Sequence, residues 1–136
     1  MDCALKDISI LVVEDDPDTR ELLKVLLQSQ GGEVTTAASV PEALSAYDNS
    51  RPNVIVADIG MPDYNGYALI ANIRKQEANQ GRTTPVIALT AYSTPADRDT
   101  ALTSGFTAYL SKPFEPQELV DTIRTLYDQH TPHKAA

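Results

Sequence analysis

The chain has 136 residues, and 19 acidic against 11 basic side chains give it a formal net charge of −8. This length suffices for one domain with one hydrophobic core. The negative charge argues against direct binding to nucleic acids or anionic membranes, because the phosphates of both attract clustered Lys and Arg. No apolar run approaches the roughly 20 residues that cross a bilayer. We therefore expect a soluble protein without a membrane or nucleic-acid partner.

The N-terminus and the cysteine content favour a cytoplasmic location. The first residues mix both charges and lack the apolar stretch of a secretory signal. Cys3 is the single cysteine, so an intramolecular disulfide cannot form. Both histidines, His130 and His133, lie near the C-terminus, where no cap or apolar anchor would hold a metal site. A reducing compartment and the absence of a zinc site are the expected consequences.

Strand and helix signals alternate from the N-terminus onward. Residues 8–13 form an apolar run of strand length. Asp16 and Pro17 then predict the start of a helix, because Asp caps helices and Pro suits their first turn. This helix should end at Gly31-Gly32. Its apolar stripe consists of Leu22, Leu23, Leu26 and Leu27.

A second and a third strand-helix pair follow. The strands are predicted at residues 33–37 and 54–57. Ser39 and Glu42 form a capping-box pattern that predicts the start of the second helix, and the third helix is predicted at residues 66–78. We expect the second helix to bury Ala43, Leu44 and Tyr47. The apolar face of the third helix carries Leu69, Ile70 and Ile73.

The remaining strands are predicted at residues 86–89 and 108–110. A short fourth helix should follow Thr94-Pro95 and end before Gly105. The fifth helix begins at Glu115-Pro116, and its apolar stripe consists of Leu119, Val120, Ile123, Leu126 and Tyr127. The helical pattern is lost after Gln129. We therefore predict one domain at residues 7–128 and a disordered tail at 129–136.

Five strand-helix units in a row predict an α/β fold. Right-handed crossovers between parallel strands place helices on both faces of the sheet, which gives a doubly wound architecture. In such sheets functional groups collect at the carboxyl ends of the strands, near the point where the strand order reverses. The candidate functional residues are therefore those that follow the predicted strands.

Acidic residues follow the first and third predicted strands. Glu14, Asp15 and Asp16 come after the first, and Asp58 comes after the third. Carboxylates brought together raise one another's pKa or share a cation. Oxygen donors without His or Cys favour Mg²⁺, with Mn²⁺ and Ca²⁺ as alternatives, over zinc. The alternative for the first group is helix capping, which we assign to Asp16; capping does not explain Asp58, because no helix start follows it directly.

The fourth and fifth predicted strands end in a hydroxyl and an ammonium group. Thr90 follows one strand, and Lys112 follows the other. Each alone is a weak signal. Together with the carboxylates, they place acids, a hydroxyl and a lysine at one edge of one parallel sheet, where the ammonium can pair with the acids or with an anion.

These residues resemble the receiver domain of two-component response regulators. The segments that carry the resemblance are 10–16 (ILVVEDD), 56–62 (VADIGMP) with Gly66, 88–91 (ALTA) and 109–114 (YLSKPF). The resemblance covers about residues 7–128 and implies a flavodoxin-like fold of five parallel strands in the order 2-1-3-4-5. It also implies that Asp58 accepts a phosphoryl group from a histidine kinase or a histidine phosphotransfer domain.

The resemblance also assigns roles to the other residues at this edge. It implies that Glu14, Asp15, Asp58 and the backbone carbonyl of Gly60 hold Mg²⁺. Glu14 stands where the family often has Asp, and its longer side chain favours contact with the metal through a water over direct ligation. It implies that Thr90 and Lys112 contact the phosphoryl oxygens, and that Lys112-Pro113 is a cis peptide bond. For this chain it implies no enzyme activity beyond catalysis of its own phosphorylation and dephosphorylation.

The expected output is a population shift. Phosphate on Asp58 would bind the Thr90 hydroxyl better in one arrangement of the fourth helix, fifth strand and fifth helix than in another. The resemblance implies that Tyr109 swings inward in this switch; the alternative is an ordinary strand aromatic. The same surface could serve as a homodimer face.

The sequence favours one biological context over several others. The segment around residues 97–110 and the polar insertion at 79–82 look most like the C-terminal receiver of a hybrid sensor histidine kinase. A stand-alone single-domain regulator, a receiver from another regulator and a phosphorylation-independent pseudo-receiver remain alternatives. A phosphate-binding α/β module is disfavoured, because the acids after the first strand would repel the phosphate.

Overall fold

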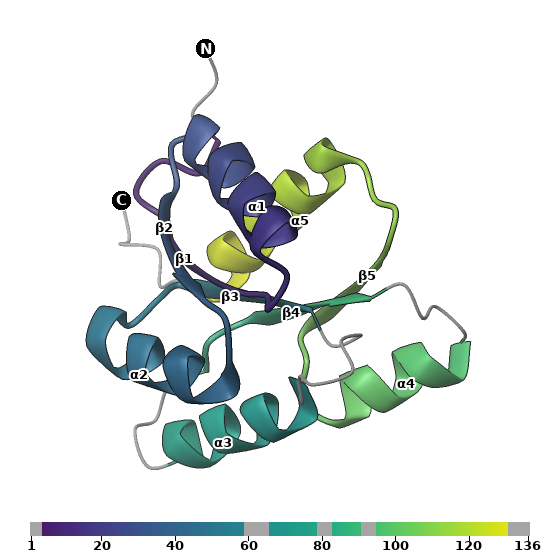
Figure 1. Cartoon of the computed structure of the whole chain (residues 1–136). Helices are drawn as coiled ribbons and strands as arrows, with labels where there is room; N and C mark the ends of the chain where they lie inside the picture. Colours follow the sequence, from purple (N-terminus) through teal and green to yellow (C-terminus); the bar gives the residue numbers. More distant parts are fainter. Residues whose placement is uncertain (1–3, 59–65, 79–82, 91–94, 131–136) are drawn as a thin grey trace.

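The computed structural model describes residues 4–58, 66–78, 83–90 and 95–130 (Figure 1). Five parallel strands form one sheet in the order β2-β1-β3-β4-β5. The strands are β1 (Ser9–Val13), β2 (Glu33–Ala37), β3 (Val54–Asp58), β4 (Val86–Thr90) and β5 (Ala108–Ser111). The helices are α1 (Pro17–Ser29), α2 (Val40–Ser50), α3 (Gly66–Ala78), α4 (Pro95–Thr103) and α5 (Pro116–His130). The predicted doubly wound fold and strand order are confirmed.

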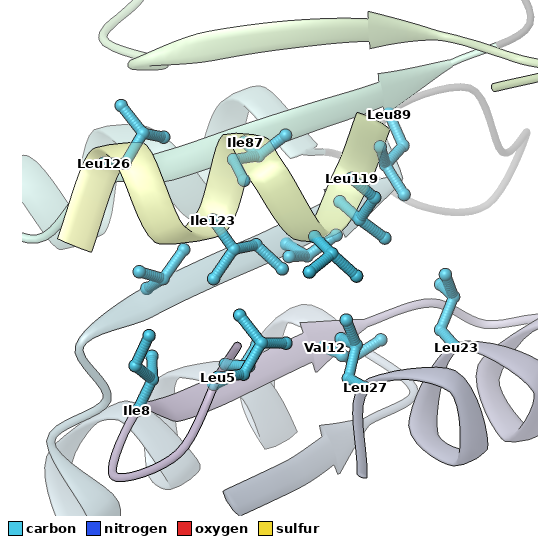
Figure 2. Close-up of a cluster of buried hydrophobic side chains, with 14 of the residues drawn as sticks. Leu5, Ile8, Val12, Leu23, Leu27, Ile87, Leu89, Leu119, Ile123 and Leu126 are labelled. Atoms are coloured by element: carbon cyan, nitrogen blue, oxygen red, sulfur yellow. The ribbon is translucent and has the colours of Figure 1, made fainter. Parts of the chain in front are cut away.

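Helices cover both faces of the sheet. Figure 1 shows α1 and α5 on one face and α2, α3 and α4 on the other. Each helix layer packs on the sheet through its own cluster of buried apolar side chains. Figure 2 shows the cluster under α1 and α5, to which α1 contributes Leu23 and Leu27 and α5 contributes Leu119, Ile123 and Leu126. Burial of each such side chain contributes about 1.5–3 kcal/mol, which holds the strand ends in register.

Three strands run one residue further than the sequence predicted. Asp58, Thr90 and Ser111 are each the last residue of their strand. Asp58 is still paired with Leu89 of β4, because the main-chain ladder of a parallel sheet does not depend on side-chain polarity. The predicted functional residues at positions 58 and 90 therefore belong to the rigid sheet rather than to the loops that follow it.

Two expectations about helices need correction. α5 continues to His130, so residues 129 and 130 are helical although we predicted them in the tail; the backbone hydrogen bonds continue where the apolar repeat stops. Residues 131–136 lie outside the described part. In the predicted stripe of α1, Leu23 and Leu27 are buried, but Leu22 is 68% exposed. The stripe is therefore wider than the surface that the sheet and α5 cover.

Both predicted helix caps next to the carboxyl ends of strands are confirmed. The Asp16 carboxylate accepts hydrogen bonds from the backbone N–H of Thr19 at 3.0 Å and from its hydroxyl at 2.5 Å. Ser39 Oγ accepts the backbone N–H of Glu42 at 3.2 Å. These bonds satisfy amides that an α-helix leaves without partners at its start.

Asp16→Ala is expected to lower the thermal midpoint, and Asp16→Asn to lower it less, because asparagine also caps helices. The bonds from Thr19 lower the pKa of the Asp16 carboxyl below its usual range. The native state therefore holds this proton less tightly than the unfolded chain, and the stabilisation by the charged cap is lost as the pH falls through the lowered pKa. Thermal melts of the three proteins at neutral and at acidic pH test this, and equal midpoints at neutral pH would contradict it.

Candidate functional site

The register of the sheet places Glu14 beside Asp58. Val13 at the end of β1 pairs with Ala57 of β3, so the next residue of each chain segment, Glu14 and Asp58, lies at the same edge. Both carboxylates are buried, with 1% of Glu14 and 3% of Asp58 exposed. Like charges buried at such close range either raise the pKa of one carboxyl or share a neighbouring cation.

The lysine predicted at this edge supplies positive charge. Lys112 Nζ lies 2.5 Å from Asp58 Oδ2 and 3.5 Å from Glu14 Oε1. Desolvation alone would lower the pKa of Lys112, but the hydrogen bond and charge of Asp58 raise it above its usual range. The ammonium group is therefore charged at all physiological pH values and bridges the two acids.

One lysine does not fully compensate the two carboxylates. Burial and the neighbouring Asp58 raise the pKa of the Glu14 carboxyl to about 7. Two buried carboxylate oxygens, Glu14 Oε1 and Asp15 Oδ1, accept no hydrogen bond from the described residues, and Glu14 Oε1 has only its ion pair with Lys112 at 3.5 Å. A buried carboxylate oxygen that accepts no hydrogen bond is costly. These oxygens can instead be ligands of a hard divalent cation.

This donor chemistry fits Mg²⁺, although the described side chains do not form a complete metal cage. Within residues 4–58, 66–78, 83–90 and 95–130, no three His, Cys, Asp or Glu side chains are grouped as they would be around a bound ion. Glu14, Asp15 and Asp58 would be the protein donors, with water completing the shell as Mg²⁺ prefers. The fourth predicted donor, the carbonyl of Gly60, lies outside the described residues.

Thr90 and Tyr109 occupy the two neighbouring strands. Thr90 is 1% exposed, and its carbonyl accepts the backbone N–H of Lys112 at 2.8 Å, which fixes the base of the lysine side chain. Tyr109 is half-buried on β5 and packs against the cluster under α3 and α4. Burial and the charge of Asp97 in α4 raise the pKa of Tyr109. The expected cis bond at Lys112-Pro113 is confirmed.

An apolar groove adjoins the site. It has a volume of about 570 Å³ and is walled by α1 on one side and by the start of α5 and the segment before it on the other. Leu22, Leu26 and Phe114 line it, together with Lys112, which also contacts Asp58. The exposure of Leu22 therefore has a local consequence: an apolar surface begins directly beside the carboxylates.

Sequence reasoning overlooked one residue that contacts the acidic turn. Arg20 donates from Nη1 to the backbone carbonyls of Glu14 at 2.9 Å and Asp15 at 3.4 Å. Its position four residues after Asp16 predicts an ordinary ion pair on the helix surface. Nothing in that spacing indicates that its guanidinium reaches main-chain oxygens instead.

Comparisons with known proteins agree on one family. The model of the family described as "Response regulator receiver domain" matches residues 10–124. An "Uncharacterized 14.6 kDa protein in sodA1 3'region" of Leptolyngbya boryana is 46% identical over 120 residues, which are 88% of this chain and 90% of that protein. A "Probable transcriptional regulator ycf27" of Cyanophora paradoxa is 41% identical over 86% of this chain and 47% of that protein.

Several of the curated relatives are longer than this chain, which spans about half of their length. Solved structures agree with the fold. The receiver domain of the Francisella response regulator 1452 is 33% identical, with a TM-score of 0.81 over 90% of this chain and 98% of that one. The chemotaxis response regulator CheY4 of Vibrio cholerae is 32% identical, with a TM-score of 0.78 over 88% of this chain and 98% of that one. In the described residues no helix is both long and apolar enough to cross a membrane.

Proposed function

Because the chain belongs to the response regulator receiver domain family, we propose that it takes a phosphoryl group from a phosphohistidine onto Asp58. The observation that carries the proposal is the buried carboxylate of Asp58 at the end of β3, paired with Lys112 at 2.5 Å and flanked by Glu14. The family signals in two-component systems. In this proposal a histidine kinase or a histidine phosphotransfer domain supplies the phosphoryl group.

In the proposed reaction a carboxylate oxygen of Asp58 forms the new P–O bond as the N–P bond of the phosphohistidine breaks, and the imidazole leaves with the bonding electrons. Lys112 neutralises charge on the acceptor and on the transferring oxygens. The Thr90 hydroxyl can then bind a phosphoryl oxygen. Bound Mg²⁺, held by Glu14, Asp15 and Asp58, would supply further positive charge to the phosphoryl oxygens. The chain would catalyse only its own phosphorylation and dephosphorylation.

The groove beside Lys112 supports docking of a protein donor. A phosphohistidine that reaches Asp58 brings its own protein surface against α1 and the segment before α5. An apolar side chain of the donor would bury Leu22, which contributes about 25 cal/mol per Å² of apolar surface removed from water. No membrane or nucleic-acid contact is part of this proposal.

We also propose that phosphorylation switches a surface of the domain. Phosphorylation would favour the arrangement in which Thr90 engages the phosphate, and α4, β5 and α5 would present the altered surface. Tyr109 adjoins both β5 and the cluster under α4, which supports a role in transmitting the change. The same surface is the candidate homodimer face.

The relatives support a stand-alone regulator more than the hybrid-kinase receiver that the sequence favoured. This chain covers 90% of the 14.6 kDa relative from Leptolyngbya boryana, and others carry the names of transcriptional regulators. None of the relatives cited above carries the name of a kinase. We therefore place the stand-alone regulator first and keep the hybrid-kinase receiver as the second candidate.

Incubation with a small phosphodonor tests the phosphoacceptor role without the cognate kinase. With phosphoramidate and MgCl₂ we expect the intact mass to increase by one phosphoryl group, in an adduct that is stable to acid and labile to base. EDTA should suppress the reaction strongly. Failure of the folded protein to gain any phosphoryl group would overturn the proposal.

A further inference from the structure

Arg20 links α1 to the turn that carries the acidic pair. Its Nη1 donates to the carbonyl of Glu14 at 2.9 Å and to that of Asp15 at 3.4 Å. Both acceptors are main-chain atoms of the turn between β1 and α1. The guanidinium therefore fixes the backbone from which the Glu14 and Asp15 side chains project.

The charge of Arg20 is not used in an ion pair. No carboxylate of the described residues lies within 4.0 Å of its guanidinium, although three acids stand between β1 and the start of α1. The Asp16 carboxylate is engaged by Thr19 instead. Asp15 Oδ1 is buried and accepts no hydrogen bond from the described residues. An arginine beside acids usually pairs with them; here Arg20 bonds to carbonyls, and Asp15 Oδ1 has no hydrogen-bond donor among the residues that the structure describes.

Other bonds hold the turn from its remaining sides. The backbone N–H of Glu14 donates to the carbonyl of Ala37 in β2 at 3.0 Å. The backbone N–H of Asp16 donates to Glu14 Oε2 at 3.2 Å. These bonds fix amides and one carboxylate oxygen, whereas Arg20 fixes the carbonyls. Without Arg20 the peptide units after Glu14 and Asp15 would lose this restraint, and the direction of both carboxylates would vary.

We propose that Arg20 is a positioning residue for the divalent cation: it orients the Glu14-Asp15 turn so that the carboxylate oxygens of both residues can bind Mg²⁺. This inference rests on the proposed function, because that function requires the metal. The charge and the positioning role of Arg20 predict opposite effects of its loss on Mg²⁺ affinity. The positive charge of Arg20 repels Mg²⁺, so removal of this charge alone should tighten Mg²⁺ binding. Loss of the orientation that Arg20 gives to the turn should weaken Mg²⁺ binding.

Titration calorimetry with MgCl₂ alone, on wild type, Arg20→Met, Arg20→Lys and Lys24→Met, distinguishes these effects. Lys24 carries the same charge one turn further along α1 and is the matched control. We expect Arg20→Met to weaken Mg²⁺ binding about 10- to 100-fold, the usual cost of losing a residue that orients metal ligands. Arg20→Lys should recover part of this loss, because one nitrogen makes both bonds in Arg20 and the ammonium on the shorter lysine side chain can still donate to one carbonyl. Lys24→Met should bind as tightly as wild type or slightly more tightly.

A thermal melt in EDTA tests whether each variant is folded at the titration temperature. Unfolding of a variant is then not mistaken for weaker Mg²⁺ binding. Unchanged or tighter Mg²⁺ binding by folded Arg20→Met would overturn the inference and leave the proposed function standing. Absence of Mg²⁺ binding by wild type would overturn both the inference and the metal's role in the proposed function.

Discussion

Asp58→Asn is expected to abolish the base-labile phosphoryl adduct while leaving the domain folded. The amide of asparagine has nearly the same shape as the carboxylate but is not a nucleophile toward phosphorus. The amide oxygen can still accept the hydrogen bond of Lys112, and the ammonium retains Glu14 at 3.5 Å as a partner. The substitution also removes one of two like charges that lie side by side. The measurement is intact mass after equal exposure of wild type and variant to phosphoramidate and MgCl₂, with circular dichroism as the test of folding.

Asp48→Asn provides the control for this substitution. Asp48 is an exposed carboxylate on α2, away from the carboxyl ends of β1 and β3, and its change to asparagine removes the same charge. This variant should gain one phosphoryl group as wild type does. An adduct of undiminished yield on Asp58→Asn would show that another group is the acceptor.

Much of this site follows from the sequence because strand ends are easy to recognise. Apolar runs mark the parallel strands, and the residue that ends each run is carried to a common edge of the sheet. Asp58, Thr90 and Lys112 were identified in this way, and the structure brings Asp58 and Lys112 into contact. The sheet order came from the family resemblance rather than from the runs themselves.

The contacts that the sequence did not predict involve residues whose partners are distant or unusual. Arg20 bonds to carbonyls, which carry no side-chain signal. Leu22 belongs to the same periodic stripe as Leu23, and only the width of the covering surface decides that one is exposed and the other buried. Glu77 is 4% exposed, although its place near the end of α3 beside polar neighbours is typical of a solvated helix face.

Glu77 is buried because three separate segments supply donors to it. Tyr47 from α2 donates its hydroxyl to Glu77 Oε2 at 3.1 Å, and the backbone N–H of Thr84, just before β4, donates to the same oxygen at 2.6 Å. Arg74 Nη1 donates to Oε1 at 2.6 Å. Arg74 also donates to the carbonyl of Gly105, at 3.1 Å from Nε and 2.8 Å from Nη2. One carboxylate thus joins α2, α3 and the approach to β4, and its arginine extends the network to the segment before β5.

Gly105 fits this network for a steric reason. Its φ of +116° lies in the region that favours glycine. A Cβ at this position would lie 3.3 Å from Cγ of Arg74 and 3.3 Å from Cγ1 of Ile70. The close approach lets the guanidinium reach the Gly105 carbonyl, so the network depends on glycine at this turn as well as on Glu77.

Glu77→Ala is expected to lower the free energy of unfolding by about 3–5 kcal/mol, because the Tyr47 hydroxyl and the Thr84 N–H lose their acceptor and Arg74 loses its charged partner. Glu77→Gln should cost less, about 1–3 kcal/mol, since the amide oxygen can still accept from Thr84 or Tyr47. Urea denaturation of both variants measures the effect, with exposed Glu21→Ala of α1 as the control, expected within about 0.5 kcal/mol of wild type. Thr84 and Glu77 lie where β4 begins, whereas Asp58 and Thr90 lie where β3 and β4 end. Folded Glu77→Gln should therefore gain the phosphoryl group on Asp58 at the wild-type rate. A loss of unfolding free energy below about 1 kcal/mol for Glu77→Ala would show that the network is not the structural link described above.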